Sequence, residues 1–344
     1  MSSQNRSCDP SRNYGCYPTL SPLTAGQLGN LVPCNHCGGV EFLIRDPDWT
    51  TVCKKCGQVL STAVGSNALK SANSQKLQIQ YGLDHLIVLN KTGGIWAYPE
   101  YEDTTPISAE SWPRIVSIAS AEDLLVGLRS DGRLLFECSE PDEAFQALEH
   151  VLRNWSDVAD IAAADHIVGL FQDGTVRATG DNDYGQCRVQ NWRNITAIAV
   201  GWDHTVGLRT DGTVQAVGKN DKNQCDVSQW TNVTAIDAAS SHTIALCSDG
   251  TVRATGDNED GQCDIQSWSN ILAISTESYF TVGLRKDGTV LTTRNNYYSQ
   301  HNVQQWSDVV EIATTHSAII GIQRDGTVLC TDSNLLEKLK VALT

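Results

Sequence analysis

The chain is 344 residues long, 40% of its residues are hydrophobic, and its formal net charge is −15. This length is sufficient for a large buried core, and with no apolar run near about 18 residues, a membrane-spanning helix is not expected. The charge is uneven: residues 76–344 hold 19 Lys and Arg against 36 Asp and Glu, whereas residues 1–75 hold six against four. Because an acidic surface repels phosphates, the larger segment is not expected to clamp a nucleic acid. Its acidity indicates either a well-solvated, soluble surface or a basic protein partner.

Residues 1–31 are rich in Ser, Asn, Gly and Pro and lack hydrophobic periodicity, so we predict a flexible N-terminal segment. The stretch MSSQNRSCDPSRN has neither the charged nor the apolar region of a secretory signal. The 12 cysteines of the chain are therefore expected to serve as thiols and metal ligands in a reducing compartment, and the predicted location is cytoplasmic.

Two C-x-x-C-G knuckles provide the most specific chemistry in the sequence. Cys34 and Cys37 form the first knuckle, Cys53 and Cys56 form the second, and 15 residues separate the two. A two-residue spacer allows both thiolates of a knuckle to reach one ion, and four sulfurs complete the tetrahedron that zinc prefers. Because protein atoms then fill all four positions, we predict one structural Zn²⁺ rather than a catalytic one.

Between the knuckles, VEFLI and WTTV alternate in the manner of short strands, which predicts a zinc ribbon over residues 32–60. The segment CNHCGGVEFLIRDPDWTTVCKKCGQVL is similar to the N-terminal ribbon of transcription factor IIB. That resemblance implies a contact with RNA polymerase or nucleic acid through the ribbon. Residues 61–75, STAVGSNALKSANSQ, are small and polar, and we predict a flexible linker.

From residue 76 onwards the sequence is repetitive. Aspartates that are each followed by glycine recur every 38 residues, at Asp173, Asp211, Asp249, Asp287 and Asp325. Looser copies of the same turn stand at Asp131-Gly132 and at Thr92-Gly93. A fixed period in this range is the signature of a repeat architecture, and these copies predict seven structural units.

Each unit has the pattern of antiparallel β-structure. In HTVGLRT and TVQAVG, small or apolar residues alternate with polar ones, and the Asp-Gly between them supplies the positive φ angles of a tight hairpin turn. A second turn, GDNxxGQ, and a third apolar run that ends at Trp follow. Three to four short strands per unit predict an all-β fold, a seven-bladed β-propeller over residues 76–344.

The repeat also carries a family resemblance. The succession G-D-N-x-x-G-Q, V-x-x-I-A and H-T-x-x-L-x-x-D-G-T-V is similar to the repeat of the regulator of chromosome condensation family. The resemblance extends from about Lys76 to Thr344. It implies a seven-bladed propeller and leaves the activity open, because members of the family share a fold and differ in function.

The second unit departs from the repeat. In SEPDEAFQALEHVL, Phe145, Leu148 and Leu152 follow one another at spacings of three and four, which predicts an amphipathic helix. An insertion on one face of a repeat array is a common binding site, so these three are the candidate partner-binding residues. The alternative is a helix that only caps the edge of a blade. The C-terminal segment SNLLEKLKVALT fits either a closing strand or a short final helix.

Residues that recur at one position of the repeat are expected to be structural. One such position holds histidine in four copies and other residues elsewhere: His85, His166, His204 and His242, against Leu124, Phe280 and Ala318. A metal or catalytic ring would not tolerate Leu and Phe, so we predict hydrogen bonds between neighbouring strands.

Two further recurring positions are predicted to serve packing. Cysteine recurs at Cys187, Cys225 and Cys263, where a small apolar residue is expected. Evenly placed tryptophans mark the junctions between units, at Trp112, Trp155, Trp192, Trp230, Trp268 and Trp306, and are expected to be packing spacers.

The sequence contains no nucleotide-binding glycine loop and no G-x-S-x-G elbow. We therefore expect a non-enzymatic protein–protein interaction scaffold or adaptor without a small-molecule substrate and without a membrane contact. The propeller is expected to bind a protein partner, and the zinc ribbon to provide a second contact. There are two alternatives: a transcription- or nucleic-acid-associated adaptor that docks through the ribbon, and a guanine-nucleotide exchange factor.

Overall fold

The computed structural model describes residues 42–45, 50–53, 59–60, 78–82, 85–89, 93–99, 108–121, 124–138, 143–293, 303–315 and 318–343. The chain divides into two compact units, Met1–Leu69 and Lys70–Thr344, and each is described by itself. Within the described ranges, no helix is at once long enough and apolar enough to cross a membrane.

The first unit contains a three-stranded antiparallel sheet. Its strands β1 (Phe42–Arg45), β2 (Thr50–Cys53) and β3 (Val59–Leu60) pair in that order. The first two strands lie where the alternating runs between the knuckles predict them. Of the predicted zinc ligands, Cys34, Cys37 and Cys56 lie outside the described residues, and only the backbone of Cys53 is described. The zinc site therefore stays a prediction.

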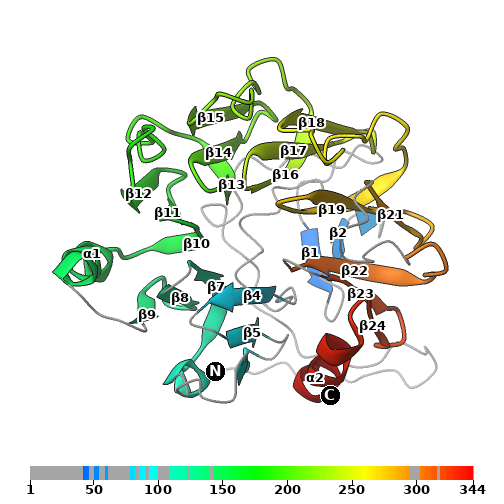
Figure 1. Cartoon of the computed structure of the whole chain (residues 1–344), viewed down its shortest axis with the longest axis horizontal. Helices are drawn as coiled ribbons and strands as arrows, with labels where there is room; N and C mark the ends of the chain where they lie inside the picture. Colours follow the sequence, from blue (N-terminus) through cyan, green and yellow to red (C-terminus); the bar gives the residue numbers. More distant parts are fainter. Residues whose placement is uncertain are drawn as a thin grey trace, which may run out of the picture. The chain divides into compact units, whose positions relative to one another are not determined.

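The second unit is an all-β fold of seven three-stranded sheets, which fits the predicted seven-bladed propeller (Figure 1). Each sheet pairs three consecutive strands in antiparallel order. Blades 1 to 3 consist of β4 (Gln78–Gly82), β5 (His85–Leu89), β6 (Ile95–Pro99); β7 (Ile115–Ser120), β8 (Leu124–Arg129), β9 (Leu134–Cys138); and β10 (Val158–Ala163), β11 (His166–Phe171), β12 (Val176–Gly180). Blades 4 to 7 consist of β13 (Ile195–Val200), β14 (His204–Arg209), β15 (Val214–Gly218); β16 (Val233–Ala239), β17 (His242–Cys247), β18 (Val252–Gly256); β19 (Ile271–Glu277), β20 (Phe280–Arg285), β21 (Val290–Thr292); and β22 (Val309–Thr314), β23 (Ile319–Gln323), β24 (Val328–Cys330).

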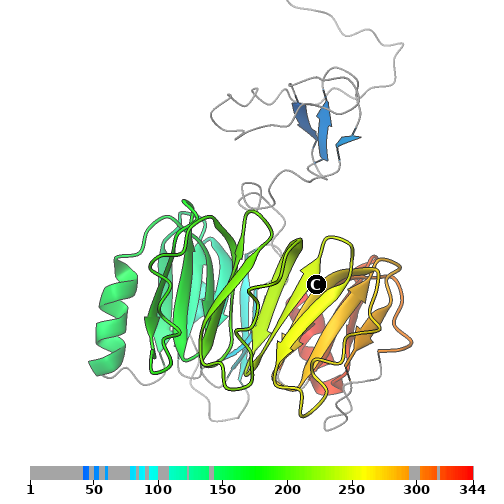
Figure 2. The same cartoon turned by 90° about the horizontal axis from the view of Figure 1, so that it is seen from above.

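The first strand of each blade lies nearest the centre of the ring (Figure 1). First strands of consecutive blades contact one another from β4 to β22, and β22 contacts β4 again. The ring is therefore closed, although no described sheet combines strands from the two ends of the repeat array. Seen from the side, the strands run between two faces of the propeller (Figure 2).

The hydrophobic core lies between neighbouring blades. The middle strands are its centre, and every residue of β11 and β17 is buried. In one cluster, Val206 and Leu208 of blade 4 pack with Ala245 and Cys247 of blade 5. A fully buried Val or Leu side chain contributes about 1.5–3 kcal/mol to stability by its removal from water. The blades therefore stabilise one another around the ring.

A tryptophan that precedes a blade packs on a glycine in the middle strand of that blade. A Cβ atom added to Gly207 would lie 2.6 Å from the ring of Trp192, and one added to Gly169 would lie 2.6 Å from Trp155. The indole therefore approaches the backbone so closely that a Cβ atom at either of these two positions would clash with it. The same pairing recurs in Trp112–Gly127, Trp268–Gly283 and Trp306–Gly321. The prediction that these tryptophans are packing spacers is confirmed.

The predicted Asp-Gly turns join the second and third strands of the blades. In blade 4 the Asp211 carboxylate accepts hydrogen bonds from the backbone N–H of Thr213 (2.9 Å) and from its hydroxyl (2.6 Å). Gly212 has a φ of 79°, which favours glycine. The two hydrogen bonds from Thr213 hold the pKa of the Asp211 carboxyl below its usual value. Local chemistry alone thus fixes the turn.

The third apolar run of the repeat forms turns in place of a strand. In blade 3, Val189 and Trp192 are both buried, and the Trp192 N–H donates to the Val189 carbonyl at 2.9 Å. Side chains three positions apart reach the same interior only if the chain turns, because a strand would point them to opposite sides. Each described blade therefore has three strands.

In blade 2 this turn segment is replaced by helix α1 (Glu143–Arg153), as the apolar spacing predicts. Helix α1 lies at the outer edge of the ring and contacts β9 and β12, so it covers the junction of blades 2 and 3 (Figures 1 and 2). A short 3-10 helix, η1 (Ser108–Ser111), occupies the corresponding place in blade 1.

The C-terminal segment, which the sequence leaves open between strand and helix, is helix α2 (Ser333–Leu343). The Asp332 carboxylate caps its first turn by accepting two backbone N–H groups at 2.8 and 2.9 Å. Leu339 is completely buried in a cluster with Leu86 of blade 1 and Ile320 of blade 7. Helix α2 therefore seals the junction at which the ring closes.

Candidate interaction surface

The connections between strands define two faces of the propeller. The hairpin face carries the Asp-Gly turns and the residues at the start of the first strand of each blade. There the Ile195 N–H donates to the Gly174 carbonyl of the preceding blade at 3.0 Å. The loop face carries the loops between first and second strands and the segments that follow the third strands. In blades 3 to 6 we define it by residues 164–165, 181–186, 201–203, 219–224, 240–241, 257–262 and 277–279.

The loop face is acidic. Its basic residues are Lys219 and Lys222, and its acidic residues are Asp165, Asp181, Asp183, Asp203, Asp221, Asp257, Glu259, Asp260 and Glu277. On the hairpin face, by contrast, basic residues such as Arg209, Lys286 and Arg324 stand beside the aspartates of the turns. A face with one dominant sign of charge attracts a partner of the opposite sign and steers its approach.

Exposed aromatic side chains lie on this same face. Tyr184 is 51% exposed, Trp202 is 53% exposed and Tyr279 is 38% exposed. Aromatic residues are enriched at protein–protein interfaces, because they offer a large contact area at a low cost in conformational entropy. Exposed aromatic rings among carboxylates are therefore typical of a surface that binds a protein.

Three carboxylates lie close together at the junction of blades 3 and 4. Burial raises the pKa of Asp165, and the charges of Asp203 and Asp181 raise it further. Asp181 is held in place by Gln186, whose Nε2 donates to its Oδ2 at 2.7 Å. Mutual repulsion of these carboxylates is thus built into the loop face, and a cation placed beside them would relieve it.

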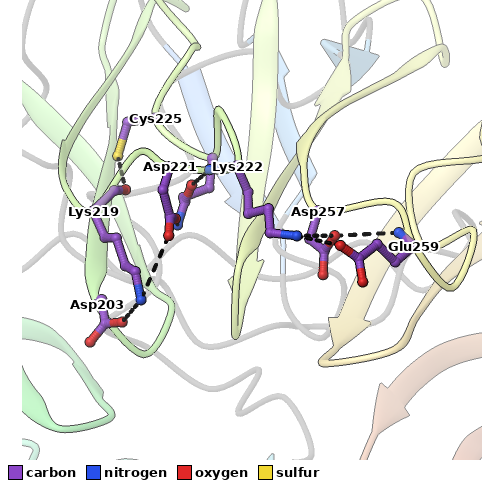
Figure 3. Close-up of polar contacts among 8 residues, drawn as sticks. Asp203, Lys219, Asp221, Lys222, Cys225, Asp257 and Glu259 are labelled. Atoms are coloured by element: carbon purple, nitrogen blue, oxygen red, sulfur yellow. Dashed lines mark hydrogen bonds and ion pairs between the residues drawn. The ribbon is translucent and has the colours of Figure 1, made fainter.

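Lys219 provides one such cation. Its Nζ lies 3.2 Å from Oδ2 of Asp203 and 4.0 Å from Oδ2 of Asp221 (Figure 3). The same Nζ lies 4.8 Å from the centre of the Tyr184 ring, within the range of a cation–π interaction. The hydrogen bond to Asp203 is the main reason why the pKa of Lys219 is raised.

Lys222 makes a second set of contacts toward blade 5. Its Nζ lies 3.6 Å from Oδ1 of Asp257 and also contacts Glu259 (Figure 3). The hydrogen bond to Glu259 is the main cause of a raised pKa of Lys222. Blade 4 therefore supplies both lysines of the loop face. Lys219 contacts carboxylates of its own blade and the Tyr184 ring of blade 3, and Lys222 contacts carboxylates of blade 5.

Backbone hydrogen bonds hold the loops of this face in place. The residue after each third strand donates its N–H to a loop carbonyl of the same blade: Asp181 to Asp165 (3.1 Å), Lys219 to Asp203 (2.9 Å) and Asp257 to Ser241 (2.9 Å). The next residue is a recurring asparagine, and in blade 4 the Asn220 side chain accepts from the Cys225 N–H at 2.8 Å. The sequence shows this asparagine as part of a turn, whereas its bond to the cysteine emerges only from the structure.

The recurring cysteines lie beneath the loop face as thiols. The Cys225 Sγ donates to the Lys219 carbonyl at 3.3 Å (Figure 3), and Cys187 and Cys263 make the same contact at 3.2 and 3.3 Å. Burial raises the pKa of Cys225 and Cys263 to about 12 and that of Cys187 to about 11. Protonated and packed in this way, they are structural residues, as predicted, and not nucleophiles.

The recurring histidines link one blade to the next. His166 Nε2 lies 2.7 Å from the hydroxyl of Thr205 in blade 4, and His204 Nε2 lies 2.9 Å from that of Thr243 in blade 5. The Thr205 hydroxyl donates to the Gln186 carbonyl at 2.8 Å. Because a hydroxyl has one hydrogen, Nε2 must donate to it, which fixes the tautomer. The predicted structural role is confirmed for His166, His204 and His242, and we call these three histidines with their threonine partners the His–Thr ladder.

The ladder histidines are buried in the neutral form. Burial lowers the pKa of His166 and His242 to about 4 and that of His204 to about 3. Their Nδ1 atoms are buried without a hydrogen-bond partner among the described residues. Over the same ranges of the chain, no group of three or more His, Cys, Asp or Glu side chains is arranged to hold a metal ion. Of His85, at the same position in blade 1, only the backbone is described.

The three candidate partner-binding residues of α1 face the core. Leu152 is completely buried, and Phe145 and Leu148 pack, partly buried, against the same hydrophobic cluster. The Phe145 ring meets Phe136 edge-on with 6.4 Å between ring centres. This packing agrees with the alternative, a helix that caps the edge of a blade. Binding of a partner through these three side chains stays a prediction.

Comparison with protein families supports the resemblance to RCC1-like propellers. The family model of the Regulator of chromosome condensation (RCC1) repeat matches residues 162–186, 195–224 and 233–262, which belong to blades 3, 4 and 5. No curated protein matches the sequence.

Solved structures with a similar fold share little sequence with this chain. The entire ectodomain of the receptor kinase CR4 from Physcomitrella patens is 16% identical, with a TM-score of 0.52 over 62% of this chain and 62% of that one. This chain thus spans less than two thirds of that ectodomain. Human WBSCR16 is 13% identical, with a TM-score of 0.51 over 69% and 78% of the two chains. The CRINKLY WD40 ectodomain of the Arabidopsis thaliana receptor kinase ACR4 is 17% identical, with a TM-score of 0.50 over 63% and 84%. At such identities the likeness shows the fold alone.

Proposed function

We propose that the protein is a non-enzymatic interaction scaffold that binds a basic protein partner on the loop face of its propeller. The observation that carries this proposal is the presence of exposed Tyr184 and Trp202 among the acidic side chains of that face. The aromatic rings offer contact area, and the carboxylates select for positive charge.

Charge distinguishes a protein partner from a nucleic acid. Binding to a nucleic acid depends on lysines and arginines that neutralise phosphates. On the loop face Lys219 and Lys222 are each already paired with carboxylates. The dominant field of this face therefore repels phosphates and attracts cationic side chains.

The predicted zinc ribbon provides a second contact in this proposal. Residues 1–75 carry six Lys and Arg against four Asp and Glu, so this part of the chain lacks the acidity of the propeller. The similarity of residues 34–60 to the ribbon of transcription factor IIB is the reason to include RNA polymerase or a nucleic acid among its candidate partners.

The proposal is tested by capture of partners on the full-length chain from a lysate of its source organism, with identification by mass spectrometry. Wild type is compared with Trp202→Ala/Asp203→Asn on the loop face. The matched control is Trp96→Ala/Asp211→Asn, because Trp96 is 40% exposed on blade 1 and Asp211 lies on the hairpin face. Circular dichroism confirms that each variant is folded.

We expect a protein that wild type and control recover and the loop-face variant loses. Equal recovery by all three chains would contradict the proposal. A Cys53→Ser/Cys56→Ser variant tests the ribbon in the same assay. If that variant alone loses the partner, and the partner belongs to a polymerase, the adaptor alternative replaces the proposal.

A further inference from the structure

The lysines of the loop face stand where neighbouring repeats have other residues. After the last glycine of the third strand, blades 3 and 5 have Asp181 and Asp257, and blade 4 has Lys219. Three positions later, blade 3 has Tyr184 and blade 4 has Lys222. Among blades 3 to 5, blade 4 alone has lysines at these two positions, and both lysines lie among acidic residues.

Lys219 shows how the loop face holds an ammonium group. Asp203 and Asp221 approach its Nζ as carboxylates, at 3.2 and 4.0 Å, and the Tyr184 ring offers its face at 4.8 Å. Two carboxylates with one aromatic ring form a receptor that would suit the side chain of any lysine or arginine. The structure therefore contains a cation subsite that the protein fills with its own side chain.

The backbone that carries Asp203 in this subsite is held in place, whereas the lysine that fills the subsite is partly exposed to solvent. The backbone around Asp203 is fixed by the hydrogen bond from the Lys219 N–H at 2.9 Å. The side chain of Lys219 remains 28% exposed, and Tyr184 is 51% exposed, so another cation can approach. Partly exposed ion pairs contribute little to folding, so replacing the resident ammonium leaves the blade intact.

We propose that the subsite formed by Tyr184, Asp203 and Asp221 binds a lysine or arginine side chain from a basic segment of the protein partner, and that Lys219 is the resident occupant that this side chain displaces. The proposal rests on the proposed function and specifies how the loop face recognises its partner. Lys222 lies between Asp257 and Glu259, and this neighbouring pair of carboxylates would take the next cation of the segment.

If a partner displaces Lys219, removal of the Lys219 ammonium should change the affinity for the partner in a known direction. A partner must compete with Lys219 for the same carboxylates, so removal of its ammonium should strengthen binding. The exposed ion pair that is lost has a strength of about 0.2–1 kcal/mol, which corresponds to roughly a 1.4- to fivefold lower dissociation constant. Removal of a receptor carboxylate should weaken binding by a similar factor.

The experiment uses the full-length chain and a fluorescein-labelled peptide of eight lysines, with a peptide of eight glutamates as the negative probe. Fluorescence anisotropy at 150 mM salt gives the dissociation constants. Lys219→Met is compared with Lys286→Met, which removes the same charge on the hairpin face. Asp203→Asn is compared with Asp211→Asn, and Tyr184→Phe, which keeps the ring, with Tyr184→Ala.

We expect Lys219→Met to tighten octalysine binding and Lys286→Met to leave it nearly unchanged. Asp203→Asn and Tyr184→Ala should weaken binding, while Asp211→Asn and Tyr184→Phe should not. Equal effects of the two lysine variants would show a response to net charge alone and would overturn the proposal. Failure of octalysine to bind either wild type or Lys219→Met would overturn it as well.

The capture experiment with the Trp202→Ala/Asp203→Asn variant separates this proposal from the proposed function. If the loop-face variant loses the partner but Lys219→Met and Lys286→Met bind octalysine equally tightly, the subsite proposal is wrong and the proposed function stands. If Lys219→Met tightens octalysine binding but capture is independent of the loop face, the subsite stands and the function is wrong.

Discussion

At the scale of single residues, the propeller depends on how closely a tryptophan can approach the middle strand of its blade. Blades 2, 3, 4, 6 and 7 have glycine under the indole, whereas blade 5 has Ala245 beside Trp230. The repeat thus contains both solutions, and blade 5 serves as an internal comparison for the others.

Gly207→Ala should destabilise the propeller by about 1–3 kcal/mol, because its Cβ would lie 2.6 Å from the Trp192 ring and a packed core resists added volume. Urea unfolding followed by tryptophan fluorescence measures the change. The reverse change, Ala245→Gly, should cost no more than about 1 kcal/mol, chiefly through backbone entropy. A Gly207→Ala variant as stable as wild type would mean that the ring moves aside at no cost.

At the scale of elements, two α-helices take the place of the turn segment that covers the outer edge of other blade junctions. Helix α1 covers the junction of blades 2 and 3, and helix α2 covers that of blades 7 and 1. The second junction joins the two ends of the repeat array, so the packing of α2 stabilises the closure of the ring.

Leu339→Ala should therefore cost about 2–5 kcal/mol, because the side chain is completely buried between blades 1 and 7. The control is Val341→Ala on the same helix, where the side chain is 57% exposed and a change within about 0.5 kcal/mol is expected. Hydrogen exchange should show the loss of protection concentrated in blades 1 and 7. Uniform loss around the ring would contradict the sealing role of α2.

The elements that could be predicted from the sequence are those whose cause is local and repeated. Asp211 and Gly212 form the turn through their own chemistry, and the apolar spacing of α1 needs no distant partner. The sequence leaves open whether a unit has three strands or four. The third apolar run is not a strand, because Val189 and Trp192, three residues apart, are joined by the hydrogen bond of a turn. Helix α2 could not be separated from a strand, because the contacts that decide it come from blade 1.

The candidate site was less predictable than the fold, because the residues that distinguish it do not recur. Trp202 and Lys219 each occur in one repeat only, and Tyr184 has a tyrosine counterpart only in Tyr298, so a search for periodicity passes over them. The histidines show the opposite case. Their recurrence predicted a structural role correctly, but their threonine partners lie in the next blade and emerge only when the ring is assembled.

At the scale of the whole molecule, the His–Thr ladder makes the stability of the propeller depend on pH. The ladder histidines have pKa values of about 3 to 4 in the folded protein against 6.5 for an unperturbed imidazole. Between these values the unfolded chain binds more protons than the folded chain, so the free energy of unfolding falls as pH falls. Above about pH 6.5 this contribution to pH dependence disappears. The raised pKa of Asp165 acts in the opposite direction, but through a single group.

We expect a loss of stability on the order of 1–2 kcal/mol per ladder histidine between pH 6.5 and pH 4.5. Urea unfolding at a series of pH values measures it. His204→Phe is the matched variant, because Phe280 occupies the same position in blade 6. It should flatten the pH dependence by about one third, given that His204 is one of the three buried histidines described. An unchanged slope would exclude the ladder as its source.

The whole chain should also contain one zinc ion. Metal analysis of the purified protein by mass spectrometry is expected to give one zinc per chain for wild type and none for Cys34→Ser/Cys37→Ser, because a tetrahedral site cannot lose two of four thiolates and still close. The control Cys187→Ser/Cys263→Ser removes thiols of the propeller and should retain the zinc. Equal zinc content in all three proteins would show that the knuckles are not the site.

The packing of Leu339 against Leu86 also sets an order of events during synthesis on the ribosome. Neighbouring blades in the middle of the array can dock as soon as the later of the two has emerged, because each contacts only its neighbours. Blade 1 emerges first, but its partner at the closing junction does not exist until α2 has been made. At about 5–20 residues per second, the more than 250 residues between Leu86 and Leu339 correspond to a delay of roughly 10 to 50 seconds. During that interval one side of blade 1 is uncovered, and a chaperone has its best opportunity to bind there.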